Sequence, residues 1–169
     1  KPFGIHAGER DPDDIDGALA YDPDYLVHMV HARDDDFEVL ENEGIPVAVC
    51  PRCNLVIPNV DLPPVKRLVE HTTVALGTDN VMLNSASMWR EMEFASKLFD
   101  VPDEEVLRMA TVNGARLVGR DDVGVVEEGK RARLVVLDGS KPKFEDSHDL
   151  VATVVRRSGP EDVKRVVLR

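Results

Sequence analysis

The sequence predicts an α/β fold with a parallel sheet, followed by a smaller β-rich piece. Four short runs rich in Val, Ile and Leu are each followed by a segment with helical spacing. Such strands, alternating with helices, are typical of a parallel sheet covered on both faces. Because eight such units close a TIM barrel of about 250 residues, four units predict half of one, over residues 1–119. The pattern changes after Gly119, and residues 120–169 are expected to form a second, all-β domain.

The expected strands of the sheet are residues 3–6, 25–30, 45–50 and 73–76. Helices are expected at 11–20, 34–43, 64–70, 87–99 and 102–117. Asp11 is expected to cap the first helix, with Pro12 at its first position, and Gly44 to end the second. In the second piece, β-branched runs separated by Gly, Pro, Ser and Asp predict an all-β segment with strands at 133–137, 150–155 and 163–168.

The composition favours a globular domain in the cytoplasm. With 169 residues and 43% hydrophobic content the chain can bury one core. It lacks an 18-residue apolar run and a signal-peptide pattern, so no membrane association is expected. The net charge of −11, from 32 acidic and 21 basic residues, argues against nucleic acid, because phosphate binding needs a cationic face.

The acidic residues lean toward Asp and the basic residues toward Arg. A surface rich in Asp and poor in Lys suits a salt-rich cytoplasm, where ions screen the repulsion between like charges. This bias indicates a halophilic source, and the alternative is an ordinary acidic cytosolic protein. The chain also opens directly into an apolar segment without Met, so we expect it to have been cut from something longer.

Polar side chains stand at the ends of three of the predicted strands. His6 ends the first strand and Glu9 follows it, His28 lies near the end of the second, and Asp79 follows the fourth. The carboxyl ends of barrel strands meet at one mouth, where active sites form. Imidazole and carboxylate groups there can hold a divalent ion, Zn or Fe, that lowers the pKa of bound water toward about 7. A nearby Glu can then carry a proton to a leaving group.

Each of these residues also has an ordinary structural interpretation. His6 could be a packed strand-end residue, Glu9 the solvated start of a helix, and Asp79 an N-cap. His28 and His31 cannot share one face of a strand unless the chain turns between them. The order and placement of the groups, more than any single one, favour a site.

Two cysteines, Cys50 and Cys53, form a single C-x-x-C pair. Such a pair is compatible with half of a zinc site or a redox pair, but no second pair is present to complete a zinc ribbon. Its position after an apolar run favours a structural role at a strand end.

Five segments in order resemble the amidohydrolase superfamily, in its cytosine deaminase and chlorohydrolase-like branch. His6 to Glu9 resembles its H-A-G-E or H-x-x-E segment, and residues 26–31 its next strand. Residues 49–54 resemble its C-P-x-S-N strand end, with Cys53 in place of Ser. Residues 75–79 resemble its metal-binding strand, and residues 110–138 resemble its exit into the small β-sandwich. The resemblance covers nearly the whole chain and implies the C-terminal half of such an enzyme, with strands 5–8 of its barrel in residues 1–119 and part of the small β-sandwich domain in residues 120–169.

The resemblance implies a role for each residue. His6 and Asp79 would be metal ligands, and Asp79 would also take a proton from the attacking water. Glu9 would pass a proton to the substrate nitrogen, and His28 would orient or polarise the water. Asn80, next to the ligand, would contact substrate. The implied reaction is hydrolysis of a carbon–nitrogen bond in a small-molecule substrate, a cyclic amidine or amide, with deamination of a purine or pyrimidine-like ring expected first.

Three departures from the family pattern bear on activity. The H-x-H pair of the family's first strand is absent from the sequence, and His71 and His148 are poor substitutes for it. The N-terminal share of the small domain is also absent, and Arg133 stands where the family usually has Asp. We therefore expect weak or no metal binding and no turnover by the isolated chain.

The alternatives are a non-catalytic half barrel and a small acidic interaction module. A half barrel would need its missing N-terminal half or a second copy, as a homo-oligomer, to cover its exposed sheet edges.

Overall fold

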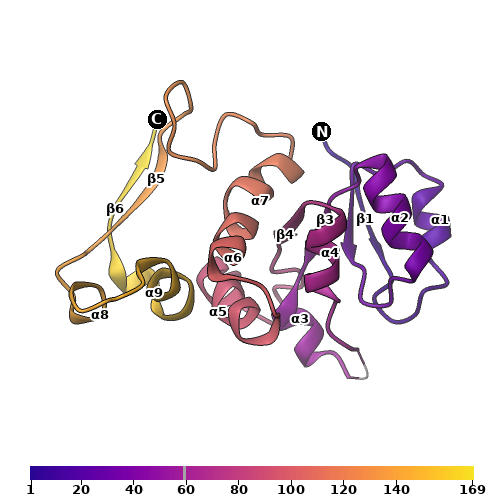
Figure 1. The fold of residues 1–169 in the computed structure, drawn as a ribbon, viewed down its shortest axis with the longest axis horizontal. Coiled ribbons are helices and arrows are strands. Elements are labelled where there is room, and N and C mark those ends of the chain that lie inside the picture. The colour runs from indigo at the N-terminus through magenta and orange to yellow at the C-terminus, as the bar shows by residue number, and fades with distance from the viewer. Residues whose placement is uncertain (59) are drawn as a thin grey trace.

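The computed structural model describes residues 1–58 and 60–169 (Figure 1). Its main sheet has four parallel strands in the order β1-β2-β3-β4. They are β1 (Gly4–Ala7), β2 (Tyr25–His28), β3 (Val47–Val49) and β4 (Val74–Leu76). The register pairs Ala7 with His28 and Val49 with Leu76, so the carboxyl ends of the strands meet at one edge of the sheet. The predicted α/β fold with a parallel sheet is confirmed.

Helices connect and cover these strands. The connections run through α1 (Ile15–Leu19), α2 (Asp34–Glu43), α3 (Pro51–Val56) and α4 (Val65–His71). After β4 come α5 (Met88–Leu98), α6 (Asp103–Ala110) and α7 (Val112–Leu117). The predicted bounds of α2 are confirmed, and Gly44 ends it in the left-handed conformation, with a φ of 67°. In the part of the chain that the structure describes, no helix is long and apolar enough to span a lipid bilayer.

The two faces of the sheet pack against different residues. On one face, strand residues Leu26, Val47 and Val74 pack with Phe37 and Leu68 of the covering helices in a fully buried core. The other face forms a smaller cluster of Val27, Ala48, Cys50, Cys53, Ala75 and Leu117. The alternation along each strand is what a period of two residues requires when both faces are covered.

The start predicted for the first helix was wrong. Helix α1 begins at Ile15 with Asp14 as its N-cap residue, not at Pro12. The Asp11 carboxylate instead accepts the N–H of Asp13, an Asx-type turn that satisfies the backbone before the helix starts. The Asp14 carboxylate accepts the N–H of Gly8 and so ties this segment to the end of β1.

The prediction of an all-β C-terminal segment was wrong, because the segment also contains helices. It contains β5 (Arg133–Leu137), α8 (Pro142–Glu145), α9 (Leu150–Arg157), the 3-10 turn η1 (Pro160–Asp162) and β6 (Val163–Leu168). Strands β5 and β6 pair antiparallel as a two-stranded ribbon, at the opposite side of the molecule from β1 in Figure 1.

The predicted strand at 150–155 is helix α9. Asp149 caps this helix by accepting the N–H of Ala152. The helix packs against α5 and α6, with Val155 fully buried, and Arg156 pairs with Asp103 at the start of α6. Tertiary packing and the cap outweigh the β propensity of its Val and Thr residues, which is a weak, context-dependent preference.

Candidate active site

Three strand ends bring their polar groups together at the carboxyl edge of the sheet. His6 lies in β1 and His28 ends β2, and the register places Ala7 opposite His28. The Nδ1 atom of His6 lies 3.0 Å from the Nε2 atom of His28, and the two rings meet edge to face. Asp79, three residues after β4, offers a carboxylate oxygen within 4.8 Å of nitrogen atoms of both rings. The structure thus groups His28 with the two residues expected to bind metal.

The backbone at these strand ends adopts a conformation that side-chain-bearing residues rarely take. His28, Met29 and Asp79 have φ values of 78°, 52° and 47°. Each such residue costs roughly 1–3 kcal/mol, and strain of this kind gathers at functional sites. The chain therefore does turn between His28 and His31, and the N–H of His31 donates to the carbonyl of Gly8.

Glu9 lies over the same group from the loop after β1. Its Oε1 atom is 3.6 Å from Nε2 of His28, and its side chain is 26% exposed. The Oε1 atom itself is buried and has no hydrogen-bond partner among the described residues. A buried polar atom without a partner is uncommon and calls for an explanation such as a bound ion or water.

His28 is fully buried, and burial lowers the pKa of its imidazole. The nearby His6 ring lowers the pKa further, whereas the carboxylates of Glu9 and Asp79 and the amide of Asn54 raise it. The Asn54 amide lies 3.5 Å from Nδ1 of His28. If that amide donates to Nδ1, the neutral ring carries its proton on Nε2, facing His6. His28 is thus held in one orientation, as a neutral donor from Nε2.

Cys53 was missed as a site residue. It lies in the first turn of α3, and its thiol donates to the Asp79 carboxylate at 2.8 Å. Burial and this carboxylate raise the pKa of Cys53 to about 11. The signal in the sequence was the match of residues 49–54 to the family's strand end, which places Cys53 where a polar Ser normally stands.

A buried ion pair next to Cys53 was also missed. Arg52 and Glu91 are both buried, and Nε of Arg52 donates to Glu91 at 2.7 Å. Arg52 also donates to the carbonyl of Ser85, and its own carbonyl accepts from Asn84. These contacts hold the loop after Asp79 against α3. Nothing in the spacing of Arg52 and Glu91 could have paired them, because 39 residues separate them.

Asn80 lies beside Asp79 but is exposed, and its side-chain carbonyl accepts the N–H of Met82. That contact shapes the loop after β4. Neither ligand group at the strand ends includes Asn80, and its contact with substrate stays a prediction.

The donor set at the strand ends fits a divalent ion. Two imidazoles and a carboxylate converge from three separate strands, and both Zn and Fe accept such ligands. The unpartnered Glu9 oxygen beside them is the kind of atom that an ion or its water would satisfy.

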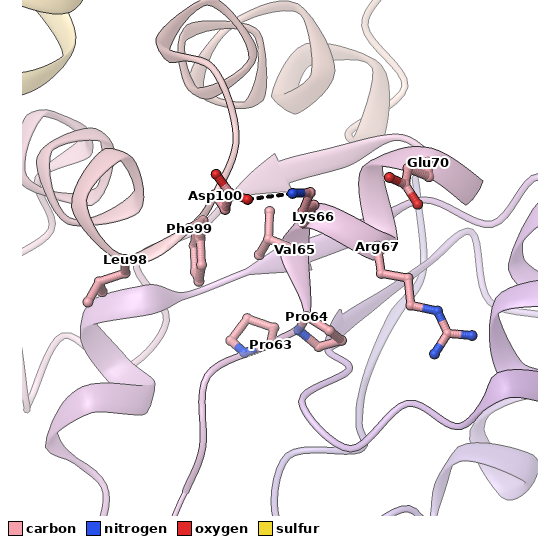
Figure 2. A pocket seen from close by; sticks show the side chains of 9 residues that line it. All are labelled: Pro63, Pro64, Val65, Lys66, Arg67, Glu70, Leu98, Phe99 and Asp100. Carbon is pink, nitrogen blue, oxygen red and sulfur yellow. Dashed lines mark hydrogen bonds and ion pairs between the residues drawn. The ribbon is translucent and has the colours of Figure 1, made fainter.

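A separate hollow of about 430 Å³ lies between the start of α4 and the end of α5. Figure 2 shows Lys66 in it paired with Asp100, while Arg67 extends away from both. Arg67 pairs with Asp34 and covers the Phe37 ring. The lining residues include no imidazole or thiol, and the charges are matched, so this hollow is not the catalytic candidate.

Residues 7–169 match the model of the Amidohydrolase family, and the chain belongs to that family. It is 38% identical to an uncharacterized protein of Methanocaldococcus jannaschii, over 96% of this chain and 46% of that protein. It is 32% identical to a 5-methylthioadenosine/S-adenosylhomocysteine deaminase of Dictyoglomus thermophilum, over 86% of this chain and 36% of the relative. The family predicted from the ordered motifs is confirmed.

Among solved structures, the fold is similar to an adenosine deaminase from Xanthomonas campestris with bound zinc. The TM-score is 0.87 at 25% identity, covering 99% of this chain and 44% of that one. The chain therefore spans less than half the length of these relatives.

Proposed function

We propose that this chain is the C-terminal half of a metal-dependent deaminase that hydrolyses the exocyclic carbon–nitrogen bond of a 6-aminopurine nucleoside. The observation that carries the proposal is the convergence of His6, His28 and Asp79 from three strand ends, with Glu9 beside them, in a member of the Amidohydrolase family. The names of two relatives, both deaminases of adenosine-type compounds, support the choice of substrate.

The finer fold assignment is part of this proposal. Four parallel strands in chain order correspond to strands 5–8 of a TIM barrel, and residues 120–169 to part of a small domain. In the described sheet β1 and β4 each pair with one neighbour, so further strands could extend it at both edges. A longer polypeptide or a second copy would supply them.

His6 and Asp79 would hold the ion, together with ligands from the other half of the barrel. When bound, the ion would supply the Lewis acidity that makes water a nucleophile near neutral pH. A binding site with only these residues is incomplete, since catalytic zinc sites commonly take three protein ligands.

The side chains of this chain would move the protons. Asp79 would take a proton from the attacking water through a carboxylate oxygen, and Glu9 would deliver a proton to the ring nitrogen next to the reacting carbon. His28, neutral and buried, would donate from Nε2 to the oxygen of the attacking water and orient it while its proton passes to Asp79. The fixed backbone turns at His28 and Asp79 would keep these atoms in place.

The second candidate is a non-catalytic half barrel that requires a partner. The absence of an H-x-H motif from the sequence favours it for the chain alone. Both candidates predict the same geometry at the strand ends, and they differ in whether the chain turns over substrate without the rest of a barrel.

The test compares this chain with the longest natural polypeptide that contains it. Loss of adenosine absorbance and release of ammonia would be measured for both, after metal content has been determined by elemental mass spectrometry. We expect deamination by the longer polypeptide, loss of at least about 10³-fold in kcat with Glu9→Gln or Asp79→Asn, and no effect of His148→Asn. No deamination of any aminopurine nucleoside by the metal-loaded longer polypeptide would overturn the proposal.

A further inference from the structure

A second group of possible ligands lies beside the histidines and includes sulfur. Ligand atoms of Glu9, Cys53 and Asp79 lie within 4.8 Å of one another. They come from the loop after β1, the first turn of α3 and the segment after β4. This group shares only Asp79 with the His6–His28–Asp79 group, and the two oxygens of that carboxylate allow it to serve either one.

The surroundings of Glu9 and Cys53 in this group fit a cation. The Oε1 atom of Glu9 is buried without a hydrogen-bond partner in the described residues, which is costly for a carboxylate. The Cys53 side chain is fully buried, and its proton lies between sulfur and the Asp79 oxygen at a separation of 2.8 Å. A cation that takes the place of that proton would bind sulfur and oxygen together and satisfy Glu9 as well.

The chemistry of the donors selects the ion. Thiolate is a soft ligand that favours Zn and other thiophilic metals, whereas carboxylate and water suit Mg and Ca. The sequence favours a structural role for Cys53, and the family pattern has Ser at its position. Replacing that hydroxyl with a thiol adds a soft sulfur donor beside Asp79, which favours soft cations over hard ones.

We propose that Glu9, Cys53 and Asp79 form a second, sulfur-containing cation site that takes a thiophilic divalent ion such as Cd²⁺ or Zn²⁺. Binding exchanges one proton for the ion: the S–H bond breaks, a sulfur–metal bond forms, and the proton leaves to solvent. The site lies beside the proposed catalytic ion position and shares Asp79 with it, but it uses neither histidine. Ion binding at this site does not depend on deaminase activity, because the site requires only these three side chains.

The test is a Cd²⁺ titration of the 169-residue chain, followed by the ultraviolet charge-transfer absorption of a cadmium–thiolate bond. We expect a saturable band at one equivalent that excess Mg²⁺ does not remove. The band is lost in Cys53→Ser and kept in Cys50→Ser, a matched control with a buried thiol outside both ligand groups. It persists in His6→Asn, which removes a ligand of the other group only.

A further variant guards against misfolding of the cysteine variants. Glu9→Gln changes a partly exposed loop residue and is expected to weaken Cd²⁺ binding at least about tenfold, with unchanged circular dichroism. No band in the unmodified chain, a band that survives in Cys53→Ser, or a band lost in His6→Asn would overturn the proposal. The last outcome would mean that Cys53 only adds a ligand to the histidine-bound ion.

Discussion

The parallel sheet and the β5–β6 ribbon are built from similar apolar residues, but their burial is opposite. Leu26, Val47 and Val74 in the sheet are 0% exposed, whereas Val135 and Val166, which face each other across the ribbon, are 53% and 54% exposed. Helices cover the sheet, and nothing among the described residues covers these two valines to the same extent. An apolar strand therefore stabilises this chain only where another element packs on it.

The largest expected effect is in the sheet region, at the buried pair of Arg52 and Glu91. Glu91→Ala should lower the free energy of unfolding by about 3–5 kcal/mol, because it leaves a buried guanidinium without its partner. Glu93→Ala, two residues along α5, removes an exposed pair with Lys97 and should cost below about 1 kcal/mol. Urea denaturation of both variants measures the difference, and equal losses would contradict it.

Truncation of paired apolar positions tests the comparison directly. Leu26→Ala in β2 should cost about 2–5 kcal/mol, since it opens a cavity in a closed core. Val166→Ala in β6 should stay within about 0.5 kcal/mol, as expected for an exposed site. A loss above about 2 kcal/mol for Val166→Ala would show that the ribbon is covered in solution, for instance by a second copy.

A third prediction concerns a buried charged contact next to the ribbon, at Asp162. The Asp162 carboxylate is fully buried and accepts from Lys141, Lys143 and the N–H of Gly159. These donors hold the pKa of Asp162 well below its usual value near 3.8. Its contribution is therefore present above about pH 4 and is lost as the pH falls through the lowered pKa.

Asp162→Asn should cost about 2 kcal/mol at pH 7, from the loss of charge-assisted hydrogen bonds. The difference in unfolding free energy between the variant and the unmodified chain should shrink as the pH is lowered below 4. Urea midpoints across this range measure this difference, and Asp146→Asn, at an exposed position directly after α8, serves as the control. A difference that does not change with pH would rule out the carboxylate as its origin.

The smallest expected effect tests the helix that replaced a predicted strand. Asp149→Ala should cost about 1 kcal/mol, because it removes the side chain that caps α9. His148→Ala, the residue before it, is exposed and should change the unfolding free energy by less than about 0.5 kcal/mol. Thermal unfolding of the two variants measures this difference, and equal melting temperatures would contradict a stabilising cap at Asp149.

Local signals in the sequence predicted some elements well. Helix α2 has the predicted bounds because Gly44 supplies a left-handed C-cap that few other residues adopt. At α1 the prediction was wrong, because Asp11 and Asp14 both resemble caps and only the contact of Asp14 with Gly8 distinguishes them. At α9 the β-branched residues favoured a strand, but packing on α5 and α6 decided for a helix.

The candidate site was likewise predicted only in part. The order of His6, Glu9, His28 and Asp79 along the chain predicted one shared mouth, and the structure brings the four side chains together. Their catalytic roles stay predictions. The contact of Cys53 with Asp79 and the pairing of Arg52 with Glu91 were not predictable, because each joins residues far apart in the sequence.

The sequence by itself determined the family, the alternation of strands and helices, and the polar residues that lie near the strand ends. These properties depend on local patterns of side-chain type, which are written directly in the chain. Only the tertiary structure decided which strands are covered, that residues 150–157 are helical, and that a thiol contacts Asp79. Burial and long-range contacts depend on how separate segments pack in space, and no local pattern contains that information.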